Sequence, residues 1–278
     1  MGIARGASRR RQVLAWCVHA YTALGLVAAA GMAVLVVDGQ EASFRWAFLL
    51  MLLATLVDCT DGVLARAVRV SEVLPGFDGR RLDDIVDFLT YTAMPLLLIW
   101  CARIVPPAHQ AWLLAPLLAS AYGFSQVSAK TADGYFLGFP SYWNVAAFYL
   151  YVLDRHVVRL PGWFSIGVLA GLALLVLVPV RYLYPSRGGP LSRLTIVLGL
   201  AWLVLVVGVG CLMPASADGS SAHRRALEVL VLVSLVFPVY YMVASWAISW
   251  RIWRQRCNRA AEQLLQGIDR AESGSRGA

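Results

Sequence analysis

Long apolar runs follow one another along almost the whole chain, and they constrain its fold more than any other feature. A helix needs about 20 apolar residues to cross the hydrocarbon core of a bilayer. Of the 278 residues, 59% are hydrophobic and 14% are charged, against about 25% charged residues in an ordinary soluble domain. We find eight runs that approach or exceed the required length, in residues 14–37, 43–66, 84–104, 110–129, 143–158, 163–184, 193–213 and 227–250. The sequence therefore predicts an all-α integral membrane protein, a bundle of about eight transmembrane helices.

The segments between these runs are mostly short, which predicts a single transmembrane domain over residues 14–250. A basic segment, residues 1–13, precedes this domain, and a basic and polar tail, residues 251–278, follows it. The first run comes directly after arginines, as the apolar part of a signal peptide would. Its length of about 24 residues exceeds the roughly 7–15 apolar residues of a signal peptide. We therefore expect an uncleaved first helix.

Basic residues are distributed unevenly between the two sides of the predicted bundle. Eight helices place both termini on one side, and the termini and loops of that side hold 18 of the 24 basic residues. The other six are Arg45, Arg103, Arg155, Arg159, Arg224 and Arg225. Because Lys and Arg favour the cytoplasmic side, we predict that both termini and residues 67–82 are cytoplasmic.

The net charge of +8 follows mostly from this asymmetry. It also suits the anionic head groups of membrane lipid. The chain has no basic, aromatic-rich soluble domain of the kind that would bind nucleic acid. We therefore expect membrane lipid, and no nucleic acid, as a partner.

Seven of the 16 acidic residues lie between positions 58 and 87. Carboxylates in or beside membrane helices are energetically unfavourable, so they indicate a function. Their spacing places two sets on helix faces, namely Asp58, Asp61, Gly62 and Ala65, and then Gly79, Asp83 and Asp87. Because consecutive helices cross in opposite directions, the carboxylates of both faces should converge on one pocket at the cytoplasmic side. Asp84 and Glu72 lie off these faces, and we assign them no role.

Four neighbouring carboxylates repel one another and cannot all stay ionised unaided. Two Mg²⁺ or Mn²⁺ ions would offset this charge, and a site made only of oxygen atoms favours such hard ions over zinc. Ions of this kind bridge carboxylates to substrate phosphates, and a pair of them suits phosphoryl transfer. The alternatives are a solvated loop whose charges face water, and a proton or cation pathway in a transporter.

The same residues resemble the signature of the CDP-alcohol phosphotransferase family. The matching strings are Asp58-x-x-Asp61-Gly62-x-x-Ala65-Arg66 and Gly79-x-x-x-Asp83-x-x-x-Asp87. Twelve residues separate Arg66 from Gly79, a longer spacer than in most members. This spacer, together with residues 73–88, 130–144 and 179–187, resembles the bacterial phosphatidylcholine synthase branch. The resemblance covers most of residues 14–250.

The resemblance implies a metal-dependent enzyme that condenses choline with CDP-diacylglycerol to give phosphatidylcholine and CMP. It implies that Asp58, Asp61 and Asp83 bind metal, and that Asp87 binds metal or is the general base that deprotonates choline. The residues implied to accommodate CDP-diacylglycerol are Gly62, Ala65, Arg66 and Gly79. For the small residues, close helix packing is the alternative, and for the arginine it is a snorkelling side chain. The implied fold is a helical bundle with a cavity open to the cytoplasmic leaflet, often a homodimer.

Choline is a permanent cation, and proteins hold such groups against aromatic faces. We expect Tyr91, Tyr142 and Trp143 at a choline site, although aromatic residues also form belts at membrane interfaces. The string Asp83-Asp84-x-x-Asp87 also fits membrane prenyltransferases, but the preceding acidic segment carries CDP-alcohol signature residues. A different acceptor alcohol, a prenyltransferase and a transporter are therefore the alternatives, in that order.

Overall fold

The computed structural model describes residues 8–126, 131, 134–184, 191–213 and 221–275. Within these residues the chain is almost entirely helical, with one two-stranded sheet. The elements in chain order are α1 (Arg9–Asp38), α2 (Glu41–Val68), α3 (Val70–Val73), α4 (Gly79–Asp87), η1 (Phe88–Ala93), α5 (Met94–Cys101), η2 (Pro107–Leu113), α6 (Leu114–Phe124), β1 (Tyr135–Leu137), α7 (Trp143–Val152), η3 (Leu153–Val157), α8 (Gly162–Leu177), β2 (Arg181–Leu183), α9 (Ser192–Leu212), α10 (Ser221–Ser234) and α11 (Val236–Ser275). Residues 1–7, Lys130 and residues 276–278, which the sequence assigns to the N-terminal segment, the 130–144 segment and the tail, lie outside the described residues.

Five helices of the described chain are long and apolar enough to cross a membrane. They are Arg9–Asp38, Glu41–Val68, Gly79–Cys101, Ser192–Leu212 and Ser221–Arg259. Each overlaps one of the apolar runs predicted above. Large apolar side chains on these helices face outward, as Val34 and Val204 do with exposed fractions of 73% and 71%. Lipid is the solvent that suits such a surface, and the chain is a multi-pass membrane protein.

The other three predicted runs form shorter α-helices, with 11 residues in α6, 10 in α7 and 16 in α8. The run 110–129 begins with the 3₁₀ helix η2, and the run 143–158 ends in the π-helix η3. Each of these two apolar runs, which hydropathy predicts as one helix, therefore contains a segment that is not α-helical.

The prediction of a helix over residues 163–184 is wrong at its C-terminal end. Helix α8 stops at Leu177, and Val178 is extended, with φ −87° and ψ 128°. Pro179 explains this, because proline disfavours the helical conformation in the residue before it. The chain then enters β2, which pairs antiparallel with β1 so that Tyr135 lies opposite Leu183.

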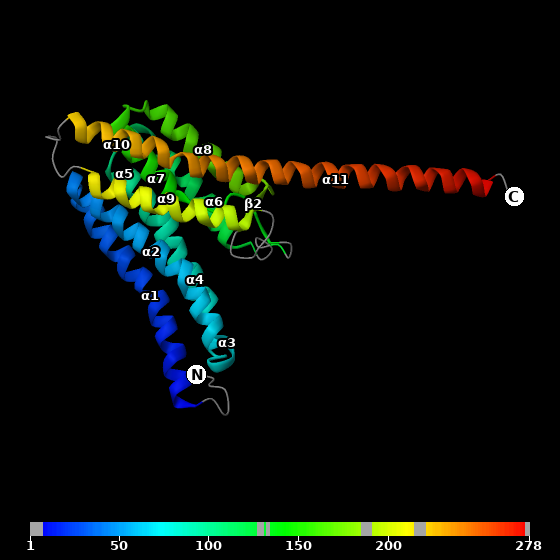
Figure 1. The fold of residues 1–278 in the computed structure, drawn as a ribbon, viewed down its shortest axis with the longest axis horizontal. Coiled ribbons are helices and arrows are strands. Elements are labelled where there is room, and N and C mark those ends of the chain that lie inside the picture. Colours follow the sequence, from blue (N-terminus) through cyan, green and yellow to red (C-terminus); the bar gives the residue numbers. More distant parts are fainter. Residues whose placement is uncertain (1–7, 127–130, 132–133, 185–190, 214–220, 276–278) are drawn as a thin grey trace.

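Helix α1 packs against both α2 and α4 (Figure 1). Small residues on α1 permit the close approach, as in many membrane helix pairs. A Cβ atom at Gly25 would collide with the side chain of Val86 on α4. The start of α4 is fixed by Asp78, whose carboxylate accepts hydrogen bonds from the backbone N–H groups of Arg80 and Arg81 at 3.1 and 3.2 Å. This cap sets the register of the acidic residues further along α4.

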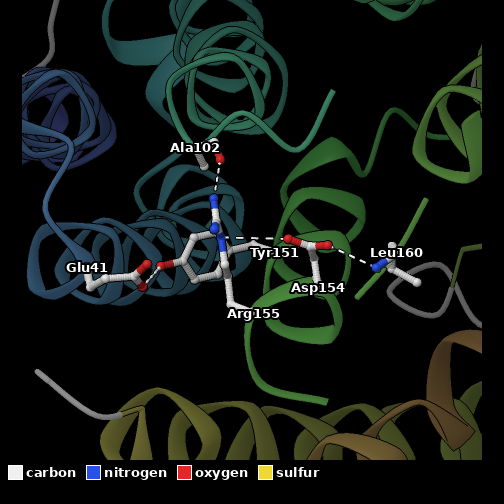
Figure 2. A network of polar contacts seen from close by, with 6 residues as sticks. All are labelled: Glu41, Ala102, Tyr151, Asp154, Arg155 and Leu160. Atoms are coloured by element: carbon white, nitrogen blue, oxygen red, sulfur yellow. Dashed lines mark hydrogen bonds and ion pairs between the residues drawn. The ribbon is translucent and has the colours of Figure 1, made fainter. Parts of the chain in front are cut away.

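Polar contacts join the start of α2 to the end of α7, and join η3 to the residue that follows α5, as Figure 2 shows. The hydroxyl of Tyr151 donates to Glu41 at 2.6 Å, and the guanidinium of Arg155 donates to the carbonyl of Ala102 at 2.6 Å. Helix α11 continues well beyond the rest of the bundle (Figure 1), so the predicted tail begins as a direct extension of the last membrane helix.

Candidate active site

Three carboxylates from α2 and α4 meet in one group. Asp58 on α2 and Asp83 and Asp87 on α4 each offer an oxygen atom, and these atoms lie within 4.8 Å of one another. All three residues are half-buried. The structure thus brings together three of the four carboxylates that the sequence predicts to converge.

This donor set fits a hard divalent cation. Two unit charges 4.8 Å apart repel by roughly 3 kcal/mol at an effective dielectric constant of about 20. Three such pairs make the fully ionised cluster unfavourable without a counter-charge. Carboxylate oxygens are the ligands that Mg²⁺ and Mn²⁺ prefer. The three residues are therefore suited to hold such an ion.

The fourth predicted carboxylate, Asp61, lies one turn further along α2 and has a different environment. It is buried, with 6% of its surface exposed, and it accepts a hydrogen bond from the hydroxyl of Thr22 on α1 at 2.8 Å. It is not part of the group of three. Helix α1 therefore contributes to the site by fixing the orientation of this carboxylate.

Tyr91 contacts the acidic group through its hydroxyl. It lies in η1, the π-helix that directly follows Asp87, and it donates a hydrogen bond to Asp58 at 2.7 Å. Its side chain is buried. A π-helical turn within an α-helix is often associated with a functional site. The sequence suggests an aromatic contact for Tyr91, and the structure adds a hydrogen bond to a candidate metal ligand.

Further aromatic rings form a cluster that begins at Tyr91. The ring centroid of Tyr142 lies 6.3 Å from that of Tyr91, 6.2 Å from that of Phe139 and 6.0 Å from that of Tyr241. Burial, and then the nearby charge of Asp58, raise the pKa of the Tyr142 hydroxyl, which therefore stays protonated. The site thus combines an anionic group with an adjacent aromatic cluster.

Trp143 belongs to the core of the bundle. None of its surface is exposed, its indole N–H donates to the hydroxyl of Ser120, and its ring centroid lies 5.8 Å from that of Phe139. These contacts favour a packing role for Trp143 over contact with a ligand.

The residues expected near CDP-diacylglycerol have mixed surroundings. A Cβ atom at Gly79 would lie 2.6 Å from the imidazole of His19, so close helix packing already explains this glycine. Ala65 is partly buried and packs against a small apolar cluster that includes Ala15 of α1 and Val70 of α3. The exposed Arg66 side chain reaches back over Gly62, where a Cβ atom would lie 3.3 Å from a guanidinium nitrogen. Arg66 is therefore the member of this set best placed to reach a ligand.

Sequence reasoning missed the contributions of α1 and α11. Thr22 carries the hydrogen bond to Asp61, His19 packs against Gly79, and Tyr241 completes the aromatic cluster. A signal existed for the first two, since they are polar residues three positions apart in an otherwise apolar run. Nothing in the local pattern distinguishes Tyr241 from other aromatic residues of its helix.

The two acidic residues to which the spacing assigns no role lie outside the carboxylate group. Glu72 forms an exposed ion pair with Arg69 at 3.8 Å. Asp84 shares α4 with Asp83 but is not among the three clustered carboxylates. The exposed ion pair of Glu72 contributes little to stability, and Asp84 lies outside the carboxylate group, so both residues serve as controls for the site.

Known proteins resemble this chain in sequence. The profile of the family described as CDP-alcohol phosphatidyltransferase matches residues 19–135, from α1 to β1. A Pseudomonas aeruginosa protein named phosphatidylcholine synthase is 39% identical over 194 residues, which cover 68% of this chain and 77% of that protein. Proteins of the same name from Legionella bozemanae and Borreliella burgdorferi are 35% and 29% identical, over 71% and 84% of this chain and 91% and 93% of theirs. The chain therefore belongs to the CDP-alcohol phosphatidyltransferase family of membrane enzymes.

Proposed function

We propose that this enzyme is a phosphatidylcholine synthase, which transfers the phosphatidyl group of CDP-diacylglycerol to choline and releases CMP. The names of its relatives support this activity. The observation that carries the proposal is the group of Asp58, Asp83 and Asp87, whose ligand atoms lie within 4.8 Å, beside the rings of Tyr91 and Tyr142. An anionic centre suits a metal-bound diphosphate, and aromatic faces suit a quaternary ammonium group.

The reaction forms one phosphorus–oxygen bond and breaks another. The hydroxyl oxygen of choline attacks the phosphorus atom that carries the diacylglycerol group. The anhydride bond between the two phosphorus atoms breaks, and CMP leaves with its bridging oxygen. The proton of choline passes to a carboxylate, and we assign this role to Asp87, since an alcohol needs a base in its transition state.

Asp58, Asp61 and Asp83 would hold the metal, together with Asp87 when it is not acting as the base. Two Mg²⁺ or Mn²⁺ ions, when bound, would neutralise the diphosphate and the departing CMP. Thr22 and Tyr91 orient Asp61 and Asp58 through hydrogen bonds of 2.8 and 2.7 Å. Such partners fix the geometry of metal ligands and commonly affect affinity about 10–100-fold.

The nucleotide and lipid would lie along the signature face of α2 and the start of α4. Arg66 would contact a phosphate oxygen of CDP-diacylglycerol. The small residues Gly62, Ala65 and Gly79 would leave room for the ligand against that face. Gly79 also makes the packing contact with His19. The acyl chains would reach the site laterally from the bilayer.

Choline would lie against Tyr91 and Tyr142, with Phe139 and Tyr241 completing the wall. Cation–π contacts contribute about 0.5–2 kcal/mol each, and more when water is excluded. An anionic acceptor, such as glycerol phosphate, would meet carboxylates and tyrosines here. The composition of the site therefore favours a cationic acceptor.

The proposed topology has eight crossings, with both termini, residues 67–82 and the carboxylate group on the cytoplasmic side of a bacterial inner membrane. The five long apolar helices would supply five of these crossings. The shorter helices α6, α7 and α8, with their flanking turns, would supply the other three. A single cysteine at Ser71 should be protected from a membrane-impermeant reagent added to intact cells; labelling from outside would overturn the orientation.

The activity is tested with the purified full-length protein, CDP-diacylglycerol and Mg²⁺ or Mn²⁺. Choline, serine, glycerol phosphate and inositol are supplied separately, and the lipid product and CMP are identified by mass spectrometry. We expect metal-dependent release of CMP and formation of phosphatidylcholine. Efficient use of another alcohol would overturn the choline assignment, and the absence of any CMP release would overturn the reaction.

A further inference from the structure

A second polar site lies at the opposite end of the bundle from the carboxylates. It is a cavity of about 320 Å³, within the roughly 300–1,000 Å³ of small-molecule pockets, lined by Arg103, Ile104, Pro106, Asp154, Arg155, Arg159, Leu160 and Gly162. The helix that begins at Gly79 ends at Cys101, which is 14 residues beyond Asp87. At about 1.5 Å per residue this separation is about 21 Å. The cavity therefore lies toward the end of the bundle that is remote from the carboxylates.

The lining of the cavity has an excess of positive charge. Arg155 is held in place by its hydrogen bond to Ala102 and by an ion pair with Asp154 at 3.7 Å. Asp154 in turn accepts a hydrogen bond from the backbone N–H of Leu160 at 2.9 Å (Figure 2). In the described part of the chain, the side chains of Arg103 and Arg159 have neither a hydrogen bond nor an ion pair. One carboxylate therefore faces three guanidinium groups.

The start of helix α8 adds to this positive potential. Gly162, its first residue, lines the cavity, and no side chain caps this end of the helix. The first turn contains no acidic residue. A Cβ atom at Gly162 would collide with Pro106, so the helix end sits tightly against the cavity wall. Free backbone N–H groups at a helix N-terminus attract anions.

The surroundings of the cavity place it at the level of lipid head groups. Trp100, near the end of α5, and Trp163, in the first turn of α8, have exposed fractions of 50% and 73%. Exposed tryptophans are typical of the boundary between hydrocarbon and water. Three of the six basic residues predicted for this side of the bundle gather at this one cavity, although basic residues are disfavoured there by the topology rule.

We propose that this cavity binds the phosphate group of an anionic phospholipid from the leaflet opposite the active site. Arg103 and Arg159 contact the phosphate, Arg155 forms the fixed floor, and Ile104, Pro106 and Leu160 face the glycerol backbone. The proposal rests on this cavity alone and does not depend on the reaction that the carboxylates catalyse.

Thermal unfolding of the full-length protein in a neutral detergent tests the proposal. Phosphatidylglycerol, phosphatidylcholine or inorganic phosphate is added in separate series, and Tm is followed by circular dichroism. We expect phosphatidylglycerol to raise Tm more than phosphatidylcholine does, with inorganic phosphate giving little shift at the same concentration. Equal shifts with inorganic phosphate would show a site for the free anion and overturn the assignment to lipid.

Variants locate the binding. The double variant Arg103→Ala/Arg159→Ala should lose most of the shift produced by phosphatidylglycerol, with binding weakened about tenfold or more through lost charge-assisted hydrogen bonds. The matched control is Arg224→Ala/Arg225→Ala, which removes two exposed arginines from the same side of the bundle and should keep the shift. A wild-type shift in the first variant would overturn the proposal. If that variant does not fold, Arg159→Ala and Arg159→Lys provide the same comparison, with the lysine variant expected to retain more of the shift.

Discussion

The two ends of the bundle carry opposite charges and hold them in different ways. At one end, Asp58, Asp83 and Asp87 lie on helices within 4.8 Å of one another, and Tyr91 donates a hydrogen bond to the first of them. At the other end, Arg103 and Arg159 lie in connecting segments after α5 and η3. Charge in a membrane protein thus does not by itself indicate chemistry. Carboxylates whose positions are fixed by neighbouring helices suit catalysis, whereas exposed guanidinium groups on loops suit binding.

The largest effect is expected from removing a clustered carboxylate. Asp83→Asn should lower the rate of phosphatidylcholine formation by about 1,000-fold, since a ligand to the metal contributes several kcal/mol to the transition state. Asp84→Asn is the matched control, because this neighbour lies outside the cluster, and it should stay close to wild type. Undiminished turnover of metal-stripped protein in excess EDTA would contradict a metal-dependent site.

The hydrogen bond from Tyr91 tests whether fixed positions matter at the carboxylate end. Tyr91→Phe keeps the ring and removes the donor to Asp58, so the metal concentration for half-maximal activity should rise about 10–100-fold. The KM for choline should change much less, because the aromatic face is retained. Tyr149→Phe removes another buried hydroxyl, one that donates to Ser234, and should leave the metal requirement unchanged. A similar rise in both variants would point to a general loss of structure.

Thr22 extends the same test to α1. Thr22→Val removes the hydrogen bond to Asp61 while keeping the volume, and activity should fall about tenfold, as expected for a hydrogen bond to a charged group. Thr22→Ser should restore most of the activity, measured under the same conditions. Equal activity in the valine and serine variants would show that Asp61 does not need this donor.

A smaller effect is expected where the aromatic cluster meets the carboxylates. Tyr142→Ala should raise the KM for choline about fivefold through loss of a cation–π contact, with little change in the KM for CDP-diacylglycerol. Tyr142→Phe keeps an aromatic face and should stay near wild type. Parallel changes in both KM values would instead assign Tyr142 to packing.

The smallest effect is expected from salt concentration, which should affect ligand binding at the arginine end more than catalysis at the carboxylate end. Exposed charges are screened more strongly than half-buried ones, and the screening length falls from about 10 Å at 0.1 M salt to about 3 Å at 1 M. The Tm shift caused by phosphatidylglycerol should therefore shrink over this range, while the effect of Asp83→Asn on the catalytic rate should persist. A lipid-induced shift that does not depend on salt would argue against contacts with Arg103 and Arg159.

Hydropathy and spacing predict the helices best where one uninterrupted segment crosses the membrane. Residues 43–66 are expected to be helical, and α2 spans Glu41–Val68. The prediction fails at residues 178–184, where Pro179 ends α8 and a strand comes next. The π-helices η1 and η3 and the 3₁₀ helix η2 differ from the flanking α-helices in their hydrogen-bonding pattern, which hydropathy does not report. Periodicity therefore could not locate them.

In the candidate site too, the sequence predicts contacts within one helix better than contacts between helices. Spacing within α2 and within α4 was enough to select Asp58, Asp83 and Asp87. It could not reveal that Thr22 faces Asp61, because the rotation of α1 about its axis depends on packing against α2 and α4. Nor could it separate the buried Trp143 from the half-buried Tyr142, since both are adjacent aromatic residues at the start of one helix.

The π-helical turn at Phe88–Ala93 has a consequence for how one continuous helix serves two environments. Each residue added to a helix rotates all later side chains by about 100° around its axis, and a π turn accommodates an extra residue without breaking the helix. The turn therefore changes the angle around the helix axis between the side chains of Asp83 and Asp87 and the apolar side chains of α5. The acidic stripe can face its partner helix while the apolar stripe keeps its own contacts in the core. In a strictly α-helical segment of this composition, the acidic residues and the apolar residues could not both face their present neighbours.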